Sequence, residues 1–149
     1  MGRVRYITPE EKSLLLKDLC GRLPYGVMIY NSYKDPTRLT GIHYSETAIK
    51  ISEASKEGPR IFNLINTCEN CVVKPYLRPM ESMTRAEREE YHSIVWDYHF
   101  INGDEDTIML YEDFDQLNNF FNSHHLDFRG LIAKDLALPA LPGMYRFDD

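Results

Sequence analysis

The segments "RLTGIHYS" (residues 38–45) and "TAIKIS" (residues 47–52) decide the fold class, because apolar and polar side chains alternate along both. In the second segment, Ile49 and Ile51 fall on one face of an extended chain and Lys50 falls on the other. This period of two is typical of strands that face a core on one side and water on the other. The two segments therefore predict strands of an antiparallel sheet.

Further strand-forming runs lie on both sides of these segments. They are "GVMIYN" (26–31), "RIFNLI" (60–65) and "CVVK" (71–74), and residues typical of turns separate them. Short strands on brief loops predict a strongly bent antiparallel sheet, or a small SH3-like barrel, over residues 26–74.

A helix is predicted before the sheet, in "TPEEKSLLLKDLCGRL" (8–23). Thr8 as N-cap, Pro9 at the first helical position and Glu11 at the third form a capping box with the preferred proline. Its apolar stripe consists of Leu15, Leu16 and Leu19. Gly21 is a natural stop, and we expect the helix to cover one open end of the sheet.

The segment "KPYLRPMESM" (74–83) interrupts the β pattern. Pro75 and Pro79 lack the N–H group that a sheet ladder requires, and each disfavours helix in the residue before it. We expect an extended linker that lies over the surface between the two halves of the chain.

A helix and then a hairpin are predicted after this segment. "TRAEREEYHSIVW" (84–96) carries a second capping box, with Thr84 as N-cap and Glu87 at the third helical position. "DYHFI", "NGDED" and "TIMLYE" (97–112) predict two strands around an Asn-Gly turn.

Two more helices are predicted near the C-terminus. "DFDQLNNFFNSHH" (113–125) has apolar residues at helical spacing, with Asp113 or Asp115 as its cap. "DFRGLIAKDLAL" (127–138) predicts a short fourth helix capped by Asp127.

Length and composition suit one compact domain, because 43% of the 149 residues are hydrophobic. We predict a single α+β domain over residues 1–149, with the first helix and the barrel-like half in 1–80 and the helix, hairpin and later helices in 81–149. No apolar run approaches the roughly 20 residues of a membrane span, and the start does not resemble a secretory signal. Three cysteines suit a reducing compartment, so we expect a cytoplasmic protein.

Charge is distributed unevenly along the chain. Residues 1–80 hold 12 Lys and Arg against 8 Asp and Glu, while residues 81–149 hold 5 against 15. A general nucleic-acid binder would show a basic face overall, so a nucleic-acid partner is not expected. Two differently charged surfaces could complement each other between copies, and we expect a homo-oligomer.

Three blocks of sequence carry a resemblance to a known group of proteins. They are "LLLKDLCGRLPYGV", "VKPYLRPMESMT" and "HHLDFRGLIAKDLALPALPGMY". Their order is similar to that in small accessory proteins encoded by bacteriophages and prophages of anaerobic gut bacteria. The resemblance implies a phage protein that acts in the host bacterial cytoplasm, and it transfers no catalytic residues.

The stretch "HHLDFRGL" (124–131) is open to three interpretations. In the first interpretation, the stretch only joins two helices, with the histidines at the negative end of one helix dipole and an aspartate capping the next helix. In the second, the joint also contacts a ligand through His124, His125 and Arg129. A catalytic role is the third, with histidine as base, but no nucleophile motif accompanies it.

Lys74, Tyr76 and Arg78 share one side of an extended backbone. A phenol between two cations is able to stack on a base while the charges meet phosphate. The alternative is a packed tyrosine flanked by solvated charges.

Two further clusters are compatible with a metal or with ordinary loops. "CENC" (68–71) has the spacing of zinc ligands and redox dithiols, but a closed zinc site needs four ligands, so a turn explains it more simply. The acidic cluster has no EF-hand spacing, and a solvated hairpin tip with a helix start accounts for it. Its members are Asp104, Glu105, Asp106, Glu112, Asp113 and Asp115. We assign no metal, cofactor or catalytic residue.

Binding without catalysis is therefore the function that the sequence favours. We predict a phage accessory protein that counters host defence, either by sequestering a small anionic, nucleotide-type signal or by inhibiting a host protein. The ligand-binding residues predicted are Lys74, Tyr76, Arg78, His124, His125 and Arg129. The alternatives are a small hydrolase or nuclease that uses histidine and carboxylates, and a nucleic-acid-binding barrel.

Overall fold

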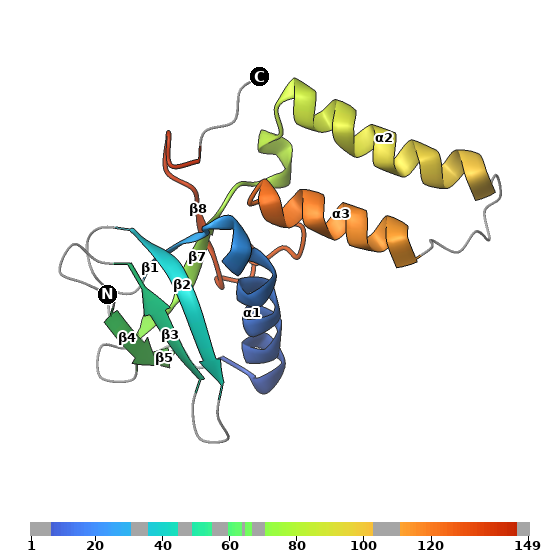
Figure 1. Cartoon of the computed structure of the whole chain (residues 1–149). Coiled ribbons are helices and arrows are strands. Elements are labelled where there is room, and N and C mark those ends of the chain that lie inside the picture. The colour runs from blue at the N-terminus through green and yellow to red at the C-terminus, as the bar shows by residue number, and fades with distance from the viewer. Residues whose placement is uncertain are drawn as a thin grey trace.

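A computed structural model of the chain describes residues 7–30, 36–44, 49–54, 60–63, 65–66, 71–102 and 111–145. A sheet packs against the helix α1 (Pro9–Arg22), and an arm of two helices, α2 (Arg85–Asn102) and α3 (Tyr111–Ser123), projects from this body (Figure 1). The α+β class predicted from the sequence is confirmed.

The main sheet has six strands in the order β4-β3-β2-β1-β7-β8. Their bounds are β1 Met28–Tyr30, β2 Thr37–Tyr44, β3 Ile49–Glu53, β4 Arg60–Asn63, β7 Lys74–Leu77 and β8 Leu138–Pro139. All neighbours are antiparallel except β7 and β8, which are parallel. The ladders run from β4 at one edge to β8 at the other, so the sheet is open and the SH3-like barrel is wrong.

Two short strands, β5 (Ile65–Asn66) and β6 (Cys71–Val72), form a separate antiparallel pair. The alternation that predicted the sheet is seen in β3, where Ile49 and Ile51 are buried and Lys50 is exposed. One face of this strand therefore belongs to the core, as the sequence indicates.

Helix α1 begins as predicted but ends later. Thr8 and Glu11 exchange hydrogen bonds between side chain and backbone, at 3.0 and 3.1 Å, so the capping box is confirmed. Gly21 does not stop the helix, which runs into the 3-10 turn η1 (Leu23–Tyr25) and ends at Gly26, with φ 70°. Gly21 instead allows close approach to α3, because a Cβ there would lie 2.9 Å from the side-chain nitrogen of Asn122.

The predicted linker at residues 74–83 is wrong in its first half. Strand β7 lies inside the sheet, where Pro75 pairs with Ile29 of β1, and β8 pairs with the other side of the strand. Proline removes only one donor from the ladder, and burial of Tyr76 and Leu77 favours the strand over an exposed linker. The 3-10 turn η2 (Met80–Ser82) then leads to α2.

The predicted hairpin at residues 97–112 is also wrong in its first strand, because α2 continues through residues 97–102. Residues 103–110 lie outside the described part of the chain. Helix α3 begins at Tyr111, so Asp113 and Asp115 are inside the helix and do not cap it. Turns replace the predicted fourth helix between residues 127 and 137.

Two apolar clusters form the interior. The first lies between α1 and the sheet and contains Leu15, Leu19, Val27, Ile29, Leu39, Ile49, Ile51, Val73, Leu77, Leu131, Leu136 and Ala137. The second lies in the arm and contains Ile94, Phe120, Phe121 and Leu126. Among the helices that the structure describes, none has both the length and the apolar character of a membrane span.

Candidate functional site

The stretch "HHLDFRGL" lies where the arm meets the sheet. Arg78 at the end of β7 forms a parallel bridge with Leu126, through Arg78 N to His125 O at 2.7 Å and Asp127 N to Arg78 O at 2.9 Å. Leu126 is fully buried. The stretch is therefore a joint that ties the end of α3 to the sheet.

The end of α3 explains the local conformation of this joint. His125 N donates to Asn122 O and Leu126 N donates to Phe121 O, at 3.2 and 3.0 Å, which is the Schellman pattern of a helix C-terminus. His125 takes the left-handed position, with φ 57°, where glycine is usual. Its ring stacks on Tyr145 with centroids 3.9 Å apart.

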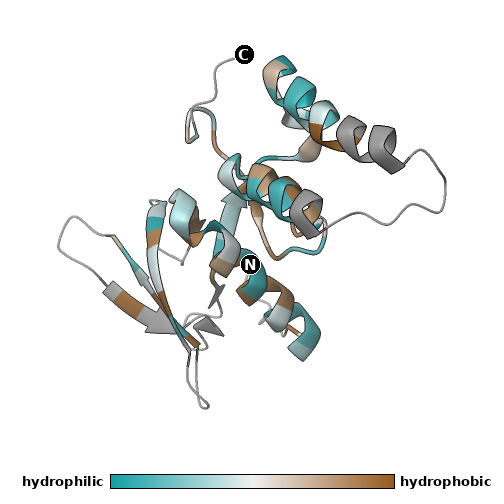
Figure 2. Cartoon of the chain, turned by 45° about the vertical axis from the view of Figure 1, so that its right-hand side comes forward, coloured by the Kyte–Doolittle hydropathy of each residue, from teal (hydrophilic) through white to brown (hydrophobic). Residues whose placement is uncertain are grey.

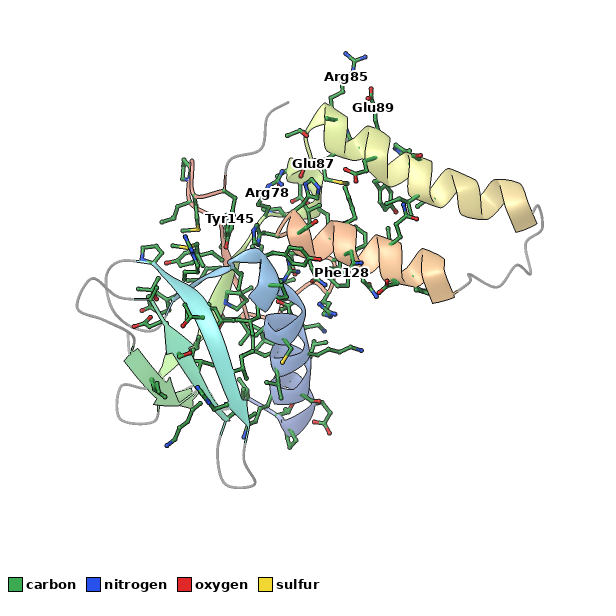
Figure 3. The ribbon with its side chains drawn as sticks, viewed as in Figure 1. Arg78, Arg85, Glu87, Glu89, Phe128 and Tyr145 are labelled. Carbon is green, nitrogen blue, oxygen red and sulfur yellow. The ribbon has the colours of Figure 1, made fainter. Side chains whose placement is uncertain are left out.

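Arg78, Glu87 and His124, which we call the Glu87 cluster, join β7, α2 and α3. Both terminal nitrogens of Arg78 donate to the carboxylate of Glu87 at 2.6 Å, which is a bidentate pair. Nδ1 of His124 lies 2.6 Å from the same carboxylate. Figure 3 shows Arg78 and Glu87 close together at the start of the arm, whereas Arg85 and Glu89 extend from the outer side of α2.

Glu87 is held in its charged form. Burial acts to raise its pKa, but the hydrogen bonds and charge of Arg78, with the backbone of Thr84, lower it from 4.5 to about 2. The same carboxylate completes the capping box of α2, because Thr84 N donates to Glu87 and Glu87 N donates to the Thr84 hydroxyl. This capping box is confirmed, and its glutamate also joins the arm to the sheet.

Asp18, Arg22 and Arg129, the Asp18 cluster, lie on the α1 side of the joint. Asp18 and Arg22 are fully buried, and Arg22 Nε donates to Asp18 at 2.9 Å. Arg129 donates to the other oxygen of Asp18 at 2.7 Å and lies over the ring of Phe128. Arg22 also donates to Leu126 O at 2.6 Å. The cluster thus fixes the joint to α1.

The remaining predicted residues are dispersed. Lys74 pairs with the exposed Asp135 at 2.8 Å, while Tyr76 is buried and its carbonyl accepts from the Tyr145 hydroxyl. Asp127 caps a turn rather than a helix, because it accepts from the N–H groups of Leu131 and Ile132. Of the six predicted ligand residues, Arg78 and His124 meet around Glu87, whereas Tyr76 and His125 both contact Tyr145. Ligand contact by these six stays a prediction.

A groove between the two helices of the arm was not foreseen. It measures about 440 Å³ and is lined by Tyr25, Glu90, Ile94, Asp115, Gln116, Asn119, Phe120 and Ser123. Both lining segments of the arm were predicted as helices, at residues 84–96 and 113–125, but local sequence patterns do not show which helices pack side by side. The spacing of Glu90 and Ile94 on one helical face was the available signal.

The predicted alternatives for metal binding fall mostly outside the described residues. Cys68 and residues 104–106 are not described, and only the backbone of Cys71 is. Within the described ranges, no group of three or more His, Cys, Asp or Glu side chains is placed to hold a metal ion.

Comparison of the chain with protein families, with curated proteins and with solved structures finds no match. The resemblance to phage accessory proteins therefore stays a prediction. Function is inferred from the geometry of the joint and the groove.

Proposed function

We propose that the chain is a non-enzymatic accessory protein that acts by binding another protein. One observation carries the proposal: three cations predicted to bind a ligand each have a carboxylate at 2.6–2.8 Å. The pairs are Lys74 with Asp135, Arg78 with Glu87 and Arg129 with Asp18. An anionic ligand would have to displace a carboxylate from each, so a protein partner is better supported than a sequestered nucleotide.

The setting of this proposal comes from the resemblance to phage accessory proteins. The partner would be a host protein of the bacterial cytoplasm, and binding would counter a host defence. The uneven charge of the chain supports a homo-oligomer, because a basic surface of one copy complements an acidic surface of another.

A small hydrolase is the second candidate, because Glu87 orients His124 as a carboxylate orients a general base. The side chain of His124 is 21% exposed, so it is accessible to a substrate. Its Nε2 faces a second carboxylate, Glu90, at 3.7 Å rather than a nucleophile. The open sheet removes the main support for the third candidate, a nucleic-acid-binding barrel.

Titration and turnover experiments on the full chain separate these candidates. We expect no saturable heat with cyclic nucleotides or ADP-ribose derivatives, and no product from phosphodiester or ester substrates. A photo-crosslinker at Tyr25, compared with one at the exposed Ser13, should capture a host protein that then binds saturably in purified form. Product that disappears in His124→Asn would establish the hydrolase, and saturable nucleotide heat would establish the sequestering protein.

A further inference from the structure

The groove between α2 and α3 combines an apolar floor with a polar rim. Ile94 and Phe120 each have an exposed fraction of 4%, so they form the floor. Hydroxyl and amide side chains lie along the α3 side, and Tyr25 of η1, 39% exposed, closes one wall. Figure 2 shows hydrophobic and hydrophilic residues mixed along both helices of the arm.

The charge of the groove has one sign. Glu90 from α2 and Asp115 from α3 contribute carboxylates, and the described lining includes no Lys, Arg or His. His124 approaches Glu90 from beside the groove, with Nε2 at 3.7 Å. Such a lining disfavours anions and favours a cation that is also partly apolar.

We propose that this groove binds a basic segment of a partner protein, whose Lys or Arg side chains are received by the carboxylates of Glu90 and Asp115. This inference rests on the proposed function and specifies the chemistry of the partner. A long cationic side chain covers apolar surface with its methylene stem and keeps its charge at the rim. The ring of Tyr25 and the amide oxygens of Gln116 and Asn119 add cation–π and hydrogen-bond partners.

Charge complementarity is what selects this occupant. The two carboxylates stand on different helices, Glu90 on α2 and Asp115 on α3, so a basic segment lying in the groove meets an acidic side chain from each wall. Arg is favoured over Lys, because its planar group is able to form two parallel hydrogen bonds with one carboxylate.

Calorimetry and amide NMR of the full chain test the proposal with the blocked peptides acetyl-LRALR-amide and acetyl-LEALE-amide. The basic peptide should bind and shift the amides of the lining residues, and the acidic peptide should not bind. The double variant Glu90→Gln with Asp115→Asn should weaken binding at least tenfold, and salt should weaken it in the wild type. Glu81→Gln with Glu89→Gln, two exposed carboxylates outside the groove, is the matched control.

Several outcomes would overturn the groove as the site. They are the absence of binding by the basic peptide, equal weakening in both double variants, and shifts confined to residues outside the groove. A doubled mass in light scattering that reverts to monomer in Glu90→Gln with Asp115→Asn would assign the groove to a second copy. Capture of a host protein with unchanged affinity in that variant would retain the proposed function and reject only this inference.

Discussion

Glu87 has three structural roles at the residue scale. It completes the capping box of α2, it receives both nitrogens of Arg78, and it lies against His124. Burying charges is costly unless they are paired with good geometry, and removing one partner leaves the other uncompensated. Arg78 and His124, which the sequence suggested as ligand-binding residues, thus contact Glu87 and join the arm to the sheet.

Glu87→Gln should lower the free energy of unfolding at pH 7 by about 3 kcal/mol, because Arg78 would stay buried without a counter-charge. Urea denaturation measures the change. Glu89→Gln is the matched control, since its pair with Arg85 is largely exposed and should contribute less than about 1 kcal/mol. Equal effects of the two substitutions would contradict the structural role of Glu87.

At the element scale, the buried His125 at the C-terminus of α3 makes the stability of the fold depend on pH. Burial is the main cause that lowers the pKa of His125 from 6.5 to about 4, and the charges of Arg22 and Arg78 act in the same direction. The histidine is therefore neutral in the folded chain, while in the unfolded chain it takes up a proton below pH 6.5. Stability is retained above pH 6.5 and falls as the pH drops toward 4.

His125→Asn should remove this loss of stability, because Asn tolerates the left-handed conformation and does not titrate. The wild type should lose up to about 3 kcal/mol of unfolding free energy between pH 6.5 and 4. Urea denaturation across this range measures the difference, and His92→Asn, at an exposed position of α2, should keep the wild-type profile. A profile unchanged by His125→Asn would show that another group controls this range.

Tyr145 connects three parts of the fold at the scale of the whole molecule. Its hydroxyl accepts from Met28 N of β1 at 2.8 Å and donates to Tyr76 O of β7 at 2.9 Å. Its ring stacks on His125 at the end of α3. The C-terminal segment thus holds the sheet and the arm together from outside the regular elements.

Tyr145→Phe should destabilise the fold by about 1–3 kcal/mol, because an N–H and a carbonyl lose their shared partner. Native-state hydrogen exchange provides a local measurement, in which the Met28 amide should lose protection. The amide of Leu39 bonds to Val27 O and should be affected only through global stability. Equal loss of protection at both amides would contradict a local role for the hydroxyl.

Those parts of the fold that depend on residues close together in the sequence were predictable. Both capping boxes are contained within four residues of sequence, and the alternation in β3 is visible in five. Elements that depend on distant partners were predicted wrongly: Pro75 lies in a strand because β1 and β8 flank it, and residues 97–102 are helical where a hairpin was predicted.

The sequence by itself determined the α+β class, the first helix start and the α2 cap, and it placed residues 124–131 at the end of a helix but predicted a second helix after them where the structure has turns. Only the tertiary structure decided what the polar residues of that joint do. Arg129 and Asp18 are separated by 111 positions, and the partner of Arg78 belongs to another element. Local propensity acts over one or two turns of chain, whereas the pairing of buried charges depends on which elements the hydrophobic clusters bring together.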